Sequence, residues 1–450
     1  PQAREATEPV GANFHRQPAH GDSRISGYRD SRLARGIPAI HCGEDVNELD
    51  DRWARNRRLV QPIFAKRHVD EFAAPMTDAA HDAVRRIREL SAGGAPVDIN
   101  AEMNRLTLDV IARTMFGTDL SGPMSEVTLR RLLQLFGTSF VTGVSRRRLR
   151  ALSNLLVRYG PNSRADAFSR LPMRVMRASA WVLEPRAMRD LRHVERVIDQ
   201  LIADHRSGAI ARKDNLLALL IDARDPETGH RYSDPEIHDE LMTFIGAGME
   251  TTATALAWAW KLLAEHPDVR ARLHDELDQV LGGRTPGAAD VDNLHWTKAV
   301  VAETMRVYPP IIGLARVARN DDMLGDVAIR AGTTVAILLH GLYHNSRAWE
   351  RPEEYDPARF LSDNLDRSAR HATLPFGAGK RMCIASGFAQ MEAVLVLATI
   401  AQQVDLDLVS EKPIRPQISF TGGPDGPMPM RPRFRARALC DGIQLETHVS

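Results

Sequence analysis

A cysteine, Cys383, follows a short turn and precedes an apolar run that is typical of a helix. The turn contains Gly377 and Gly379, and the apolar run extends from residue 388 to residue 400. A thiolate, the form of cysteine that binds metals, is favoured at a helix N-terminus because the dipole and the N–H groups face it. Glycines let the backbone pass close to a flat ligand, and Arg381 offers a fork of donors to a carboxylate. These groups suit haem, with sulfur for the iron and a guanidinium for a propionate. For the cysteine alone, a buried thiol at the start of a core helix is the alternative.

The stretch from residue 376 to residue 387 resembles the haem-binding loop of the cytochrome P-450 family, the haem-thiolate monooxygenases. The family pattern is Phe-x-x-Gly-x-Arg-x-Cys-x-Gly, and Ala385 stands where the family usually has glycine. We expect that alanine to tighten the packing under the haem. The resemblance implies haem b as the cofactor, with Cys383 as the iron ligand. It assigns these loop residues to cofactor binding: Phe376, Gly377, Gly379, Arg381 and Ala385.

A second group of reactive side chains lies in a long stretch from Ser233 to Glu265. Ser233 and Glu236 form a capping box, which predicts a helix start, and His266-Pro267 predicts its end. The stretch is apolar on nearly every face between residues 241 and 263, so we expect it to run through the core. Carboxylates and hydroxyls inside such a helix are costly to bury without partners. Their presence therefore indicates a function.

The polar residues of this helix are Glu250 and Thr251, which follow Ala247-Gly248. The two small residues leave space for a ligand against the backbone, and the Thr251 hydroxyl lies at that gap. The stretch resembles the family's Ala-Gly-x-Asp/Glu-Thr-Thr pattern, which flanks bound dioxygen. The resemblance implies that Thr251 and Glu250 are catalytic and that Ala247 and Gly248 contact the cofactor. The alternative is a threonine that bonds only to its own helix.

Two further segments carry candidate cofactor-binding side chains. Trp53 and Arg57 are four residues apart in a predicted helix that Pro62 interrupts, so they share a face. From these residues alone, an amphipathic surface helix is an equal interpretation. The resemblance implies that both residues bind a haem propionate, and that Arg316 binds one as well.

A predicted helix from residue 290 to residue 308, ended by Pro309-Pro310, contains Glu303 and Arg306. These residues are three apart and can pair on one face, as in many surface salt bridges. The resemblance implies a buried cluster of Glu303, Arg306 and Arg359. Its role would be structural, because it would lock the loop that leads to Cys383.

The composition places the chain among ordinary globular proteins. It has 450 residues, of which 43% are hydrophobic and 26% are charged, and a net charge of +1. This charge gives no electrostatic case for nucleic acid. Three cysteines are too few for a disulfide framework, which favours a reducing compartment and a cytoplasmic location. We find no membrane-spanning run. Because the chain begins at Pro1, a lost N-terminal anchor and peripheral membrane association stay open.

The resemblance runs from about residue 51 to residue 437 and implies a mainly α fold with a small β part. In it, a long central helix lies over the haem and the cysteine loop lies beneath. Strands are predicted within residues 327–339, and a hairpin within 410–437. We expect residues 1–50 to form an irregular, truncated leader without the N-terminal strands of the main sheet. Residues 51–450 would form one haem-thiolate monooxygenase domain.

The implied reaction inserts one atom of dioxygen into a small lipophilic substrate. Residues expected near the substrate are Phe244, Ala247, Ile311 and Ile312. We find no flavin or iron–sulfur motif, so electrons would come from a ferredoxin or a flavoprotein reductase. We expect Arg52, Arg55, Arg58 and Lys380 to form a basic docking patch for that donor. Two alternatives stay open: a non-redox haem-thiolate isomerase or dehydratase, and an inactive haem-binding homologue. The Glu-Thr pair argues against the first.

Overall fold

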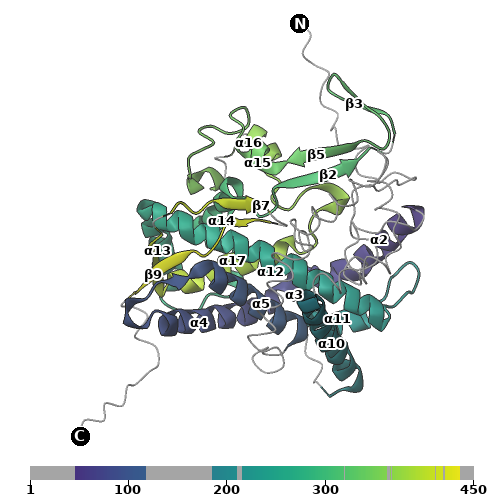
Figure 1. Cartoon of the computed structure of the whole chain (residues 1–450), viewed down its shortest axis with the longest axis horizontal. Coiled ribbons are helices and arrows are strands. Elements are labelled where there is room, and N and C mark those ends of the chain that lie inside the picture. Colours follow the sequence, from purple (N-terminus) through teal and green to yellow (C-terminus); the bar gives the residue numbers. More distant parts are fainter. Residues whose placement is uncertain are drawn as a thin grey trace, which may run out of the picture.

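The computed structural model describes residues 46–117, 185–209, 215–318, 320–361, 365, 367–410, 412–418 and 421–435 (Figure 1). Most of the predicted leader, residues 1–45, lies outside the described residues. The division of the chain at residue 50 therefore stays a prediction. The described part is mainly helical with short strands, which confirms the predicted fold class.

The helices are α2 (Val46–Val60), α3 (Lys66–Glu71), α4 (Ala73–Leu90), α5 (Ile99–Phe116), α10 (Pro185–Ser207), α11 (Leu216–Asp222), α12 (Asp234–Glu265), α13 (Pro267–Leu281), α14 (His295–Val307), α15 (Leu339–Tyr343), α16 (Arg367–Ala372) and α17 (Ser386–Ala401). Short 3₁₀ turns include η1 (Gln61–Phe64), η5 (Pro357–Phe360) and η6 (Gly379–Arg381). The predicted interruption at Pro62 is confirmed, because α2 ends at Val60 and η1 follows.

The long helix α12 crosses the middle of the molecule (Figure 1). It begins as predicted, since the Ser233 N–H donates to Glu236 Oε2 at 2.9 Å. It ends at the predicted place, where the His266 N–H donates to the Leu262 carbonyl at 3.0 Å. It packs against α5, α10, α14 and α17, and it is buried on all faces between Thr252 and Leu263. Together, α4, α5, α12 and α17 form most of the core.

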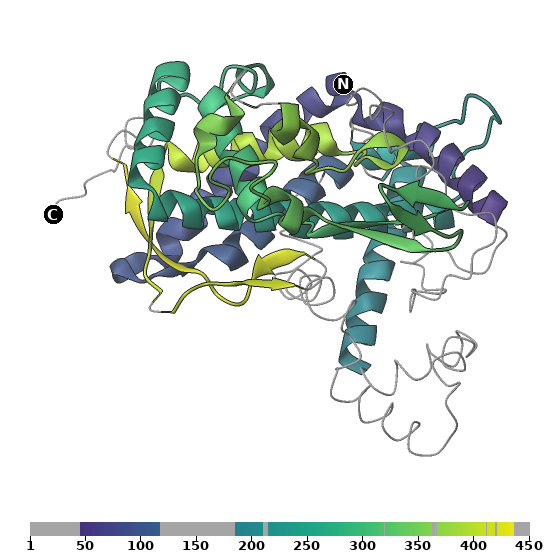
Figure 2. The same ribbon diagram turned by 90° about the horizontal axis from the view of Figure 1, so that it is seen from above.

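Within the described residues, four small antiparallel sheets accompany this helical core. One has the order β1 (Val97–Asp98), β9 (Pro429–Phe434), β6 (Val404–Leu408), and the others pair β2 (Gly313–Val317) with β5 (Thr334–Leu338), β3 (Asp322–Leu324) with β4 (Val327–Ile329), and β7 (Pro416–Ile418) with β8 (Gly422–Pro424). Both strands predicted within residues 327–339 are present, but they pair with β3 and β2 instead of each other. The predicted C-terminal hairpin is present as β7–β8. Figures 1 and 2 show β9, which pairs with β6, at one end of the molecule and β2–β5 towards the other.

Candidate active site

The loop that presents Cys383 is shaped by its own backbone. Gly377 and Gly379 both have φ of 72°, in the left-handed region that favours glycine. The Cys383 N–H donates to the Phe376 carbonyl at 2.9 Å, which closes the loop. Ala385 is the N-cap of α17 with φ of −95°, a conformation that alanine adopts without strain. The alanine that departs from the family pattern therefore fits this backbone.

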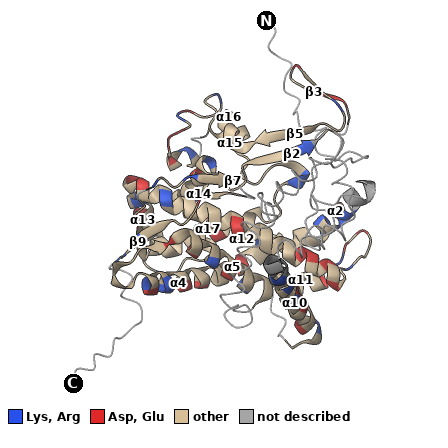
Figure 3. Cartoon of the chain, viewed as in Figure 1, with Lys and Arg blue, Asp and Glu red and all other residues tan. Residues whose placement is uncertain are grey.

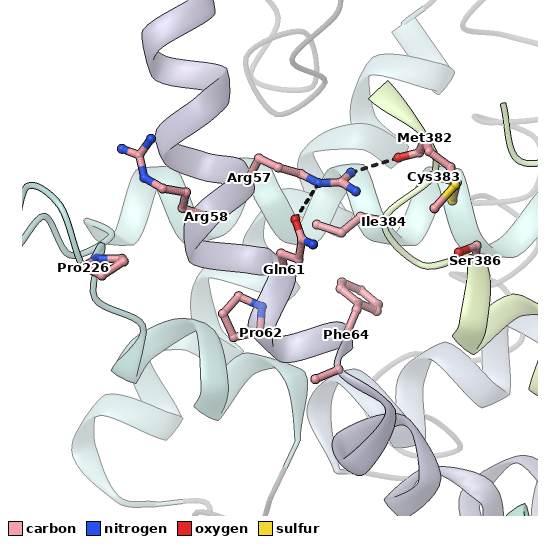
Figure 4. Close-up of a pocket in the computed structure, with 11 residues that line it drawn as sticks. Arg57, Arg58, Gln61, Pro62, Phe64, Pro226, Met382, Cys383, Ile384 and Ser386 are labelled. Atoms are coloured by element: carbon pink, nitrogen blue, oxygen red, sulfur yellow. Dashed lines mark hydrogen bonds between the residues drawn. The ribbon is translucent and has the colours of Figure 1, made fainter. Parts of the chain in front are cut away.

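Helix α2 packs directly against this loop. Arg57 donates from Nη1 to the Met382 carbonyl at 2.9 Å and from Nε to Gln61 Oε1 at 3.3 Å (Figure 4). The guanidinium of Arg381 lies over the Trp53 ring, 3.7 Å from its centroid. The structure thus brings together three of the four residues that we expected at the propionates. The fourth, Arg316 on β2, donates to the carbonyl of its neighbour Ala315 at 2.8 Å.

A pocket of about 530 Å³ lies between α2, η1 and the cysteine loop, and Cys383, Arg57, Phe64 and Ser386 are among the residues that line it (Figure 4). The thiol of Cys383 is free and the residue is exposed. The atoms around the sulfur still crowd it, and this burial raises the pKa of the thiol. The Ala385 backbone and the charge of Arg57 act in the opposite direction. A bound metal cation would shift the balance strongly towards the thiolate.

On α12, Glu250 and Thr251 have different surroundings. The Thr251 hydroxyl donates to the Ala247 carbonyl at 2.8 Å, the local bond that we considered as the alternative. Glu250 is 8% exposed, and its Oε1 accepts from the Thr421 hydroxyl at 2.7 Å. Glu250 Oε2 is buried with no hydrogen-bond partner in the described part of the chain. Burial raises the pKa of this carboxyl, and the Thr421 hydroxyl opposes the shift.

Ala247 and Gly248, the two small residues before this pair, have different surroundings. We expected both Ala247 and Gly248 to leave space for a ligand. A Cβ on Gly248 would lie 3.1 Å from the Ile111 side chain, so this glycine admits the close approach of α5 instead. Ala247, by contrast, is exposed although the helix around it is buried. Ala247 is therefore the residue of the two that can face a cofactor.

Glu303, Arg306 and Arg359 lie together in a buried cluster. Arg306 donates to both Glu303 oxygens, at 2.7 and 2.8 Å, and the Glu303 side chain is 0% exposed. Arg359 Nε lies 3.5 Å from Glu303 Oε1. Arg306 also donates to the carbonyls of Tyr343, Pro352 and Glu354. The cluster fixes the chain between α15 and η5, ahead of the cysteine loop.

Arg55 and Arg58, which we expected in the docking patch on α2, already form ion pairs within the chain. Arg58 donates to both oxygens of Asp225, at 2.8 and 3.0 Å, and Arg55 lies 3.0 Å from Glu236. Asn56 donates to Glu240 Oε1 at 2.9 Å. Figure 3 shows the basic residues of α2 beside the acidic start of α12. These arginines anchor α2 to its neighbours, and the patch that we predicted is largely neutralised.

Sequence reasoning missed two residues that contact the central polar stretch. Thr421 gave no signal, since it lies between the β7 and β8 segments, far along the chain from Glu250. Glu392 is fully buried on α17 and accepts a hydrogen bond from Thr252. Burial raises its pKa to about 8. A lone acid within the apolar run of residues 388–400 was a signal that could have revealed it.

The residues expected near the substrate are part-buried or exposed. Phe244 makes an edge-to-face contact with Phe64, with ring centroids 5.6 Å apart, and Ile311 and Ile312 follow α14. Within the described residues, no helix is both long enough and apolar enough to span a membrane.

We compared the sequence and the fold with those of known proteins. The cytochrome P-450 family profile matches residues 19–426. Cyclooctatin synthase from Streptomyces melanosporofaciens is 34% identical over 83% of this chain and 76% of its own length. Cyclooctat-9-en-7-ol 5-monooxygenase from the same organism is 33% identical over 77% of this chain and 69% of its own length. The crystal structure of the cytochrome P-450DA haem domain superposes with a TM-score of 0.70 at 28% identity, covering 86% of this chain and 78% of that one.

Proposed function

The chain belongs to the cytochrome P-450 family and is a haem-thiolate monooxygenase, and we propose that it oxygenates a lipophilic substrate with electrons from a separate protein. The observation that supports this proposal best is the packing of α2 against the cysteine loop. That contact gathers Cys383, Arg57, Arg381 and Trp53 in one place. A thiol and nearby guanidinium groups suit a haem, with sulfur for the iron and guanidinium groups for the propionates.

The residues present fit haem. The Cys383 thiol is free and exposed, and Ala247 is exposed in the middle of a buried helix, as expected if a flat group covers both. Cys383 would be the iron ligand, and Arg57, Arg381, Trp53 and Arg316 would hold the propionates. When bound, the haem supplies the iron that activates dioxygen and inserts one oxygen atom into the substrate.

We assign proton delivery to Glu250 and Thr251. A carboxyl with a raised pKa keeps its proton nearer to neutral pH, where it can act as a general acid. The Thr251 hydroxyl donates to Ala247, and its lone pairs remain able to accept a hydrogen bond from water or from the protonated Glu250 carboxyl. Glu250 would supply the proton, and Thr251 would pass it towards the dioxygen side of α12.

The substrate class rests on the side chains that the resemblance puts near the substrate. Phe244, Ile311 and Ile312 are apolar and part-buried, and Ala247 is small. Apolar side chains of this kind favour a hydrocarbon-rich molecule. One relative is named for its action on cyclooctat-9-en-7-ol, an alcohol with a carbon–carbon double bond. As the electron donor we propose a ferredoxin or a flavoprotein reductase, the partners that the resemblance implies.

The deciding experiment is the absorption spectrum of the reduced protein with carbon monoxide bound. We expect a thiolate-type spectrum from the wild type and its loss in Cys383→Ser. Cys42→Ser and Cys440→Ser are the matched controls, because they remove the other cysteines of the chain. A thiolate-type spectrum that survives in Cys383→Ser would refute the assignment.

A further inference from the structure

We propose that Thr421 is a positioning residue that holds the carboxyl group of Glu250 and leaves one of its oxygens to exchange the proton. This inference rests on the proposed function of Glu250 and deepens it. The Thr421 hydroxyl donates to Glu250 Oε1 at 2.7 Å, although the two residues are 171 positions apart in the sequence. Thr421 is 2% exposed, so water does not compete for this bond.

The second oxygen of Glu250 shows why the contact matters. Oε2 is buried and has no hydrogen-bond partner within the described residues. Burial and the Thr421 hydroxyl are the influences on the Glu250 pKa, and no charged side chain of the described part contributes. A hydrogen bond to a carboxylate favours its ionised form. Thr421 therefore fixes the direction of the carboxyl and limits how far burial raises its pKa.

Thr421 is held in place by the chain around it. The Trp258 indole N–H donates to the Gly422 carbonyl at 2.9 Å, and the Gly422 N–H donates to the Pro310 carbonyl at 2.9 Å. Trp258 in turn stacks on Tyr308, with ring centroids 4.1 Å apart. The start of the β8 strand is thus tied both to α12 and to the segment that follows α14.

Gly422 also has no room for a side chain. A Cβ there would lie 2.9 Å from the Pro309 carbonyl oxygen and 3.0 Å from the Ile312 side chain. The backbone beside Thr421 therefore packs against Ile312, a residue that we expect near the substrate. An alanine at this position must move the hairpin, and with it the hydroxyl that Glu250 accepts.

The test is the protonation of Glu250 itself, measured in the haem-loaded enzyme. Infrared spectra taken across a pH series follow the C=O stretch of the protonated carboxyl, and Glu250→Gln identifies the band. In Thr421→Val the band should persist to higher pH than in the wild type, because the bond that favours the carboxylate is gone. Thr421→Ser keeps a hydroxyl and should titrate as the wild type does. Thr399→Val is the matched control, since Thr399 is a fully buried threonine whose hydroxyl, in the described part of the chain, bonds only to its own helix, at 2.7 Å.

Gly422→Ala gives a second, independent arm because it keeps the Thr421 hydroxyl but displaces it. It should shift the Glu250 titration in the same direction as Thr421→Val. If Thr421→Val does not bind haem, the titration of Gly422→Ala tests the inference in its place. An unchanged Glu250 titration in the variant that loads haem overturns the inference. Productive turnover of Glu250→Gln, measured separately, tests the proposed function. If that variant forms as much product per reduced cofactor as the wild type, Glu250 has no role in catalysis. That outcome would leave the infrared result for Thr421 unchanged.

Discussion

The guanidinium carbon of Arg381 lies 3.7 Å from the centroid of the Trp53 indole ring. This contact joins the cysteine loop to α2, and the bond from Arg57 to the Met382 carbonyl, 2.9 Å long, joins them a second time. Two contacts of different kinds hold the loop in one place relative to the helix. Trp53, Arg57 and Arg381, three of the residues assigned to the propionates, are therefore held together by contacts within the chain.

The first prediction follows from this contact. Arg381→Gln removes the cation over Trp53, a contact worth roughly 0.5–2 kcal/mol. We expect the variant to lose haem faster to a haem-accepting protein and to unfold at a slightly lower temperature. Arg272→Gln is the matched control, because it removes a similar cation that lies 3.8 Å from the Trp296 ring centroid. Equal rates of haem loss from the two variants would contradict the role of Arg381.

The second prediction concerns the buried cluster around Glu303. Arg306→Met leaves the Glu303 carboxylate buried without its main partner, which typically costs about 3–5 kcal/mol of folding free energy. Urea unfolding of the variant measures this loss. Arg351→Met is the control, since Arg351 pairs with Glu354 at 2.6 Å on the surface, where such pairs contribute about 0–1 kcal/mol. Similar losses in both variants would show that the cluster is not a structural anchor.

Local signals in the sequence predicted the helices well. The Ser233 cap and His266-Pro267 gave the ends of α12, because both signals act through neighbouring backbone groups. The cysteine loop was predicted from its glycines and its arginine for the same reason.

Contacts between distant segments were not predictable in this way. Nothing near Thr421 indicates that its hydroxyl reaches Glu250, and nothing near Gly248 indicates that α5 lies against it. The resemblance also gave the arginines of α2 a docking role, while the acids that neutralise them lie in segments more than 150 residues away. Pairing of that kind is set by the tertiary fold.

The third prediction is a pH dependence of stability from Glu392. Its pKa is raised from 4.5 to about 8 in the folded protein. Between these values the folded state keeps a proton that the unfolded state releases, so stability falls as the pH rises from about 4.5 to about 8. Glu392→Gln should flatten this part of the curve of unfolding free energy against pH. Glu240, with a pKa raised to about 7, adds a slope of the same sign, and Glu240→Gln measures that share separately. A slope unchanged in Glu392→Gln would show that Glu392 is ionised in the fold.

The fourth prediction is that Thr251→Ala binds haem and substrate but wastes reducing equivalents. Its hydroxyl is part-buried and, among the described residues, bonds only to the Ala247 carbonyl of its own helix, so its loss should not disturb the fold. Product formed per reduced cofactor consumed should fall by up to about 10²-fold, the lower end of what a general acid contributes. Thr251→Ser should restore most of it. Wild-type coupling in Thr251→Ala would remove this hydroxyl from proton delivery.

The last prediction concerns the electron donor, which we expect to dock on the face nearest the cysteine. Lys380 is exposed within the cysteine loop, whereas Arg58 is bonded to both oxygens of Asp225, a carboxylate that is 1% exposed. Lys380→Glu should therefore slow transfer of the first electron at low salt, and the difference should shrink as salt screens it. The thermal midpoint of this variant should match that of the wild type.

Arg58→Glu should behave in the opposite way. It removes the ion pair with Asp225 and places a like charge beside that carboxylate, so we expect a lower thermal midpoint than in the wild type. Its electron-transfer rate should change only as far as α2 is disturbed. Stopped-flow reduction and thermal melts of both variants separate the two effects. If the rate of first-electron transfer depends neither on Lys380→Glu nor on the salt concentration, the donor docks on a different face.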